Sequence, residues 1–191
     1  MENNMVFLIK RRSFLKAISI IIPTSQIFRF FPAWGSNDVI APLTKILRSL
    51  KNPVCEKAAR IIENRYKKGN LYVLHLRHAM LSESDAKIIS GSIQLLHKNH
   101  DIRLKSFSLS YNPNIGAEGA TAILSSLPEH IEELGLVGCN LDDRIGSHII
   151  KFIKQSKYLK LVCIEDNNFS REMRLTIADL KSQNEDCTII V

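Results

Sequence analysis

Histidines are the residues of this 191-residue chain whose types and spacing best suit metal chemistry. His75 and His78, and again His97 and His100, are three residues apart, a spacing that can bring two imidazoles together on one face of a helix. The first pair, however, spans an expected strand and the turn after it, and the second lies at an expected helix end. The sequence therefore predicts no metal site.

Motifs that bind phosphate or activate a nucleophile do not occur in the sequence. There is no G-x-x-x-x-G-K-[ST] loop, H-E-x-x-H helix, G-x-S-x-G elbow or C-x-x-C pair. No serine is accompanied by a recognisable base and orienting acid. Gly116 and Gly119 fit a turn and a helix-packing contact better than a phosphate loop. We therefore predict no catalytic residue, no cofactor and a protein that is not an enzyme.

Four segments share one spacing of apolar residues. Each has apolar residues at its first, fourth and sixth positions and a small or amide residue at its ninth. The segments are LYVLHLRHAML from Leu71, LKSFSLSYNPNI from Leu104, IEELGLVGCNL from Ile131 and LKLVCIEDNNF from Leu159. Their sixth positions are 33, 27 and 28 residues apart: Leu76, Leu109, Leu136 and Ile164. Each unit then continues with apolar residues at helical spacing: Ile89, Ile93 and Leu96; Ala120, Leu124 and Leu127; Ile145, Ile149 and Phe152; Met173, Ile177 and Leu180.

A short strand, a turn and a helix per unit, with a period near 28 residues, resembles the leucine-rich repeat of the ribonuclease-inhibitor type. The clearest match is NPNIGAEGATAILSSLP, residues 112–128, and the resemblance covers roughly residues 70–183. It implies an α/β fold class, a short solenoid of about four strand-turn-helix units with an N-terminal helical cap. The alternative is a plain α/β domain whose leucine spacing is accidental.

The repeat pattern assigns a direction to each side chain of a strand. Positions four and six face the core, whereas positions three, five and seven face outward. The resemblance implies that the ninth residue satisfies the backbone of the turn, which Ala79 cannot do, so the turn of the first repeat departs from the pattern. The outward positions form the predicted concave binding face, with a small-residue middle that leaves room for a partner: Val73, His75, Arg77, Ser106, Ser108, Ser110, Glu133, Gly135, Val137, Leu161, Cys163 and Glu165.

The ends of a solenoid need covering, because an open unit exposes apolar surface and a strand edge. We predict three parts: an export signal over 1–35, a helical cap over 36–69 and a leucine-rich repeat domain over 70–191. Within the cap, helices are expected over 42–50 and 53–68, with Asn52 as N-cap and Gly69-Asn70 as the end. CTIIV, residues 187–191, is expected to form a final edge strand. Cys163 should then face outward beside Cys187, and both a disulfide between them and a reduced pair fit the sequence.

The first 35 residues differ from the rest in charge. They hold five basic residues against one acidic residue, a net charge of +4, whereas the whole chain carries +7. The apolar run 17–28 has 12 residues, too short as a helix for the roughly 30 Å core of a bilayer. RRSFLK resembles the twin-arginine signal of bacteria, and the matching residues are Arg11, Arg12, Phe14, Leu15 and Lys16. This implies export to the periplasm or envelope of a bacterium; a basic tail on a cytoplasmic protein is the alternative.

Charge also bears on the class of partner. Residues 69–191 hold 13 basic against 15 acidic residues, so nucleic acid is an unlikely partner and the basic residues of 53–68 read as a solvated helix face. Membrane contact is expected only through the signal. The resemblance implies a non-enzymatic module that binds an unknown protein partner on its concave strand face. The alternatives are a regulator of an enzyme, similar to a GTPase activator, and a structural protein of the envelope.

Overall fold

The computed structural model describes residues 39–66, 71–99, 102–183 and 186–191, all within the compact unit Asp38–Val191. The export signal predicted over 1–35, the end of the second cap helix at Gly69-Asn70 and the side chain of His100 lie outside the described residues. Among the residues that are described, no helix combines the length and apolar character needed to span a bilayer.

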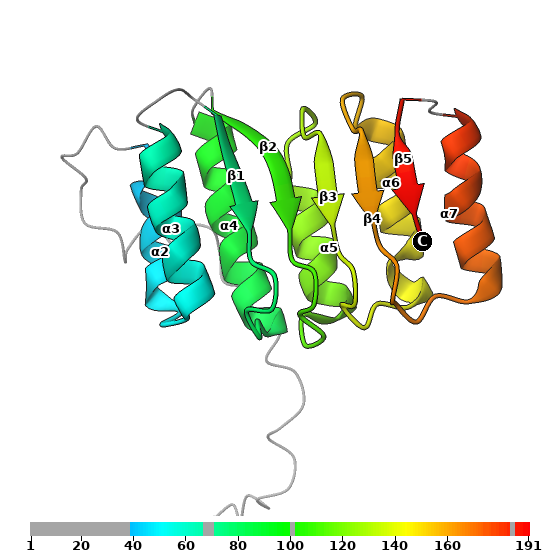
Figure 1. Cartoon of the computed structure of the whole chain (residues 1–191), viewed down its shortest axis with the longest axis horizontal. Helices are drawn as coiled ribbons and strands as arrows, with labels where there is room; N and C mark the ends of the chain where they lie inside the picture. Colours follow the sequence, from blue (N-terminus) through cyan, green and yellow to red (C-terminus); the bar gives the residue numbers. More distant parts are fainter. Residues whose placement is uncertain (1–38, 67–70, 100–101, 184–185) are drawn as a thin grey trace, which may run out of the picture. The chain divides into compact units, whose positions relative to one another are not determined.

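Five parallel strands form one sheet in the order of the sequence (Figure 1). They are β1 (Leu71–His75), β2 (Arg103–Ser108), β3 (Glu133–Gly135), β4 (Leu161–Cys163) and β5 (Thr188–Ile190). Each of the first four strands is followed by a helix that lies on the same face of the sheet (Figure 1). The helices are α4 (Glu83–Asn99), α5 (Gly116–Ser126), α6 (Gly146–Gln155), preceded by the 3₁₀ turn η2 (Asp143–Ile145), and α7 (Arg171–Gln183).

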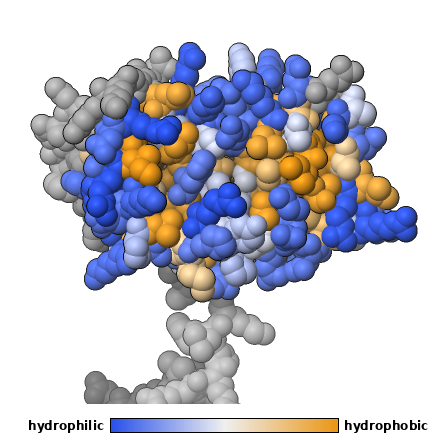
Figure 2. All heavy atoms as spheres, in the orientation of Figure 1, coloured by the Kyte–Doolittle hydropathy of each residue, from blue (hydrophilic) through white to orange (hydrophobic). Residues whose placement is uncertain are grey.

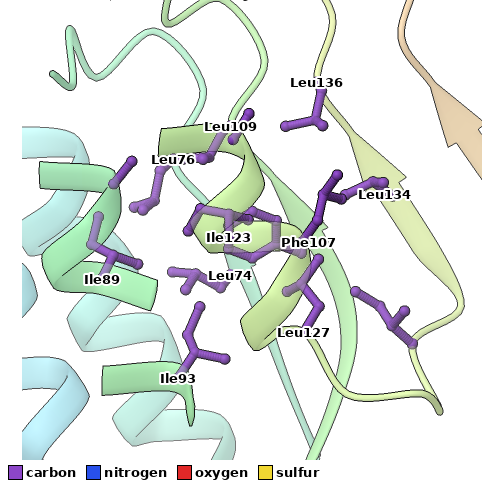
Figure 3. Packing of buried hydrophobic residues seen from close by; sticks show 14 of the residues in the cluster. Leu74, Leu76, Ile89, Ile93, Phe107, Leu109, Ile123, Leu127, Leu134 and Leu136 are labelled. Atoms are coloured by element: carbon purple, nitrogen blue, oxygen red, sulfur yellow. The ribbon is translucent and has the colours of Figure 1, made fainter. Parts of the chain in front are cut away.

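The expected strand-turn-helix repeat is confirmed, and the chain has the α/β fold of a short leucine-rich repeat solenoid. The core lies between the sheet and the helix layer. Side chains at the fourth and sixth strand positions point toward the helices, as Figure 3 shows for Leu74 and Phe107, which approach Ile93 and Ile123. All eight of these strand side chains are at most 1% exposed: Leu74, Leu76, Phe107, Leu109, Leu134, Leu136, Val162 and Ile164.

The N-terminal cap consists of α2 (Ala41–Ser49) and α3 (Pro53–Tyr66), and α3 packs beside β1 (Figure 1). Asn52 is the N-cap of α3, because its Oδ1 accepts hydrogen bonds from the backbone N–H of Val54 at 2.8 Å and of Cys55 at 3.4 Å. Its amide nitrogen also donates to the carbonyl of Ala79 at 2.7 Å. One side chain therefore starts the cap helix and ties it to the turn of the first repeat.

Asparagines at the ninth position hold the turns together from one repeat to the next. The Nδ2 of Asn112 donates to the carbonyls of Leu76 and Leu109 at 2.8 and 2.6 Å, and its Oδ1 accepts from the N–H of Leu81 at 3.0 Å. Each asparagine therefore satisfies backbone groups of the preceding unit as well as its own. The turn of the first repeat is therefore supported although Ala79 cannot bond its backbone. Asn112 bonds this backbone from one side and Asn52 bonds it from the other.

Candidate functional site

The face of the sheet away from the helices presents three rows of side chains that run across the strands; we call it the open face. The register of the parallel ladder aligns the first two rows, and backbone bonds from His78, Tyr111 and Gly138 to the next strand align the third. The first row is Val73, Ser106, Glu133, Leu161 and Thr188, and the second is His75, Ser108, Gly135, Cys163 and Ile190. The third row is Arg77, Ser110, Val137 and Glu165.

The middle of the open face corrects one expectation from the sequence. The three serines and Val137 were expected to be exposed, but each is buried, with exposed fractions of 5% for Ser106, 8% for Ser108, 2% for Ser110 and 5% for Val137. Adjacent parallel strands lie only about 4.8 Å apart, so a short side chain is covered by its neighbours. Ser108 and Ser110 are bonded to each other through their hydroxyl groups at 3.1 Å.

Gly135 does not leave room for a ligand side chain either. A Cβ atom at this position would lie 2.8 Å from the Oγ of Ser108 and 3.1 Å from the Oγ of Ser110. The space in front of its backbone is therefore already filled by the hydroxyl groups of β2 and the residues after it. The middle of the open face is a closely packed, smooth floor, and the contact residues lie on both sides of it.

On the β1 side, the open face is cationic and aromatic. The ring of Tyr111 stacks on the ring of His78 with centroids 4.4 Å apart and planes 4° apart, and the guanidinium of Arg77 lies 5.5 Å from the Tyr111 centroid. His75 shares a 2.7 Å hydrogen bond with the hydroxyl of Ser106. Burial lowers the pKa of His75, and the nearby Glu133 carboxylate acts in the opposite direction.

The repeat pattern did not predict Tyr111 as a contact residue, and the spacing of the histidines singled out His78 only as a possible metal ligand. Both occupy the eighth repeat position, where the backbone of every unit is left-handed: φ is 55° at His78, 62° at Tyr111, 59° at Gly138 and 58° at Asp166. Three of these four residues are not glycine, so no glycine pattern announces the conformation. Their contact with the open face could have been inferred from their place in the repeat, because each directly follows the outward-facing seventh position.

On the β4 and β5 side, the open face is acidic and apolar. Leu161 and Cys163 are half-buried, Ile190 is 44% exposed, and hydrophobic residues gather over this side of the face in Figure 2. Glu133 and Glu165 are half-buried in the same region. Burial, followed by the Glu165 carboxylate, raises the pKa of Cys163, so its thiol is held in the neutral form.

The histidines and cysteines show no further chemistry. His75 and His78 make separate contacts, and within the described residues no three His, Cys, Asp or Glu side chains are grouped closely enough to hold a metal ion. All four cysteines are free thiols. Cys163 is opposite Ile190 in the ladder, and not opposite Cys187, so the alternative of a disulfide between the two cysteines is not realised in this structure.

Cavities on the helix side of the molecule include two that are lined by described residues. The larger, about 640 Å³, is lined by eight residues around the end of α4 and the loop before β3: Gln94, His97, Lys98, Ile102, Ser126, Leu127, Pro128 and His130. The smaller, about 340 Å³, lies between α5 and α6 and includes His148 and Lys151. Neither cavity includes a residue of the open face.

Comparison with known proteins finds solved structures with low similarity to this chain. No protein-family model matches the chain, and no curated protein matches it. The Mex67 LRR domain from Chaetomium thermophilum is 16% identical with a TM-score of 0.47, over 77% of this chain and 90% of that one. A structure of Chaetomium Mex67:Mtr2 subunits is 18% identical with a TM-score of 0.46, over 70% of this chain and 85% of that one. The assignment of this chain to a leucine-rich repeat fold rests on its own four strand-turn-helix units and their asparagine-bonded turns.

Proposed function

We propose that this chain is a non-enzymatic protein-interaction module that binds its partner on the open face. The observation that carries the proposal is the division of that face into two contact regions on a rigid floor. Arg77, Tyr111 and His78 form one region, and Glu133, Glu165, Leu161, Cys163 and Ile190 form the other. Tyrosine and arginine are enriched where proteins bind one another, and a scaffold of packed strands holds such side chains in place at small entropic cost.

We also propose that the repeats are of the ribonuclease-inhibitor type. The support is the regular α-helix on the far side of each unit, from the 10 residues of α6 to the 17 residues of α4. The predicted concavity of the open face follows from this, because a layer of helices is wider than a layer of strands and bends the array toward the strands.

The proposal is tested by capturing partners with the purified full chain, identifying them, and repeating the binding with the purified partner and variants. Arg77→Asp and Leu161→Asp change exposed or half-buried positions of the open face and should abolish binding with little change in the melting temperature. Leu175→Asp, at a position 61% exposed on α7, is the control and should bind normally. If the open-face variants still bind and Lys57→Glu with Arg65→Glu on α3 does not, the basic cap helix is the binding site instead.

We further propose export of the chain by a folded-protein translocase, with loss of about 30 to 36 residues, on the basis of Arg11, Arg12, Phe14, Leu15 and Lys16. Cell fractionation and N-terminal sequencing of the wild type should show a shortened protein outside the bacterial cytoplasm. The double variant Arg11→Lys, Arg12→Lys should remain inside at full length. Full-length cytoplasmic protein in both cases would contradict export.

A further inference from the structure

We propose that the acidic half of the open face binds an extended segment of the partner, in which an apolar side chain has one cationic side chain on each side of it. This half of the face is formed by Glu133, Leu161, Cys163, Glu165 and Ile190. The inference rests on the proposed function and deepens it, because it names the chemistry of the partner and the part of the face where it lies.

The carboxylate of Glu165 has an oxygen atom whose hydrogen-bonding capacity is not satisfied by the described residues. Its Oε2 atom is buried and has no hydrogen-bond partner among the described residues. A buried polar atom without a hydrogen bond is costly, and such atoms are uncommon in native proteins. A carboxylate that has already lost part of its water also loses less on pairing with a cation, and the pairing is stronger where water is displaced. A lysine or arginine brought by a partner to the accessible part of the half-buried Glu165 side chain would balance the charge of this carboxylate.

Glu132 provides an internal comparison. Its carboxylate lies 2.8 Å from the Nζ of Lys160 and 3.8 Å from that of Lys105, so its charge is balanced within the molecule. The next residue, Glu133, points to the open face and forms no ion pair within the described part of the chain, and the same holds for Glu165. The two acidic residues of the open face therefore carry charge that is available to a partner.

Apolar side chains lie between and beside the two carboxylates. Cys163 is in the row between those of Glu133 and Glu165, and its thiol is held neutral, so it behaves as a small hydrophobic group. Leu161 is directly beside Glu133 in the ladder, and Ile190 is beside Cys163. An apolar side chain of the partner would therefore meet Cys163 and Ile190, while its flanking cations meet the carboxylates.

The spacing favours an extended segment. Glu133 and Glu165 are four repeat positions apart, which is about 13 Å along the strands. In an extended chain, side chains i, i+2 and i+4 share one face and span about the same distance. In a helix, side chains i and i+4 are only about 6 Å apart along the axis. The buried serines and Gly135 leave a smooth floor over which such a main chain can pass.

The opposite half of the open face sets the position of the segment. His75 is the last residue of β1, and Arg77 follows it in the turn. The positive charge of Arg77 acts to lower the pKa of Cys163 across the sheet, and it acts in the same direction on the pKa of His75. A cationic segment shifted toward β1 would meet the positive charge of Arg77 and be repelled. The charge pattern therefore directs it to β3, β4 and β5.

The test uses the full chain and a labelled synthetic peptide, acetyl-Ala-Lys-Ala-Leu-Ala-Lys-Ala-amide, followed by fluorescence anisotropy at low salt. We expect saturable binding that weakens by about tenfold in the double variant Glu133→Gln, Glu165→Gln, since each half-buried ion pair contributes about threefold. Glu118→Gln, an exposed residue on α5, is the matched control and should bind the peptide like the wild type. A peptide with glutamates in place of both lysines should not bind. Circular dichroism should show the same fold for all variants, because neither glutamine replaces a group in a described ion pair.

Three results would overturn the inference. One is peptide binding that is equal in the wild type and the double variant, and a second is no peptide binding to the wild type at all. The third is concentration-dependent self-association of the wild type that the double variant loses in sedimentation experiments, which would identify a second copy as the occupant. None of these results removes the proposed function, which depends on whether Arg77→Asp and Leu161→Asp lose the purified protein partner.

Discussion

The ring of Tyr111 lies directly over the backbone of Gly138 in the next repeat, so that a Cβ atom at Gly138 would be 2.9 Å from the Cδ1 atom of Tyr111. With His78 stacked on Tyr111, the eighth positions of the first three repeats form one continuous column. At Gly138 the left-handed backbone, with φ of 59°, favours glycine, and the close approach of the aromatic ring leaves no room for a side chain.

Gly138→Ala should lower the free energy of unfolding by about 2 to 3 kcal/mol, of which about 1 kcal/mol comes from the left-handed backbone and the rest from displacing the ring. Urea unfolding followed by circular dichroism measures the change. Gly91→Ala is the control, because a Cβ atom at Gly91 in α4 would have no neighbour within 4 Å. It should stabilise the helix by about 0.5 to 1 kcal/mol. Equal unfolding midpoints for the two variants would contradict the close contact.

Asn167→Ala should be destabilising by about 2 to 4 kcal/mol, because it leaves several buried backbone groups without partners. The Oδ1 atom of Asn167 accepts from the N–H groups of Cys139 and Leu141 at 2.9 and 3.0 Å, and its Nδ2 donates to the carbonyls of Leu136 and Ile164 at 2.8 Å each. Asn114→Ala removes the same side chain from an exposed position and should change stability by less than about 0.5 kcal/mol. Chemical denaturation of both variants measures the difference. Similar losses of stability in the two variants would mean that the ninth-position asparagines are not a major support of the turns.

Leu136→Ala should lower the free energy of unfolding by about 2 to 5 kcal/mol, the range for emptying a packed core site. Its side chain is 0% exposed and lies between the sheet and the helix layer (Figure 3). Glu129→Ala, in the exposed loop after α5, should have little effect. The comparison of urea midpoints checks the repeat register, and a loss at Glu129 as large as that at Leu136 would show that the register is wrong.

His97 should make the protein less stable as the solution becomes acidic. Its Nε2 shares a 2.9 Å hydrogen bond with the hydroxyl of Tyr72, and its ring is 5.7 Å from that of His130. Burial, followed by the nearby His130, lowers the pKa of His97 to about 4. The unfolded chain, with an ordinary histidine pKa of about 6.5, then binds the proton first, so this contribution is complete above pH 6.5 and is lost as the pH falls toward 4.

The measurement is the urea midpoint of the wild type and of His97→Gln at pH 7 and at pH 5, because glutamine can keep a hydrogen bond to Tyr72 but does not titrate. The wild type should lose about 2 kcal/mol more than the variant over this interval. His75, whose pKa is lowered in the same direction, is present in both proteins and cancels in the comparison. An equal loss in the two proteins would show that His97 does not contribute.

Much of the fold could be predicted from the sequence, because its signals are local and repeated. Apolar residues, mostly leucines, recur at the fourth and sixth strand positions of every unit, and apolar residues at helical spacing follow them. A strand or helix buries the face that its own periodicity makes apolar. The start of α3 could likewise be predicted from neighbouring residues alone, because Asn52 before Pro53 is a typical N-cap. The rows of the open face followed from the same alternation, and the ladder register pairs Ser106 with Glu133 and Gly135 with Cys163.

The surroundings of those side chains depended on distances between repeats, which no single repeat encodes. Ser108 and Ser110 point outward and are still buried, because their neighbours on the next strand close over them. His78 stacks on Tyr111, and the Ala79 turn is supported by Asn112 and Asn52; each of these contacts joins residues more than 20 positions apart. The burial of the Glu165 oxygen likewise depends on the packing of neighbouring units. The sequence by itself determined the repeat and the direction of its side chains, whereas the tertiary structure decided which of them a partner can touch, because exposure is set by the packing of one strand against the next.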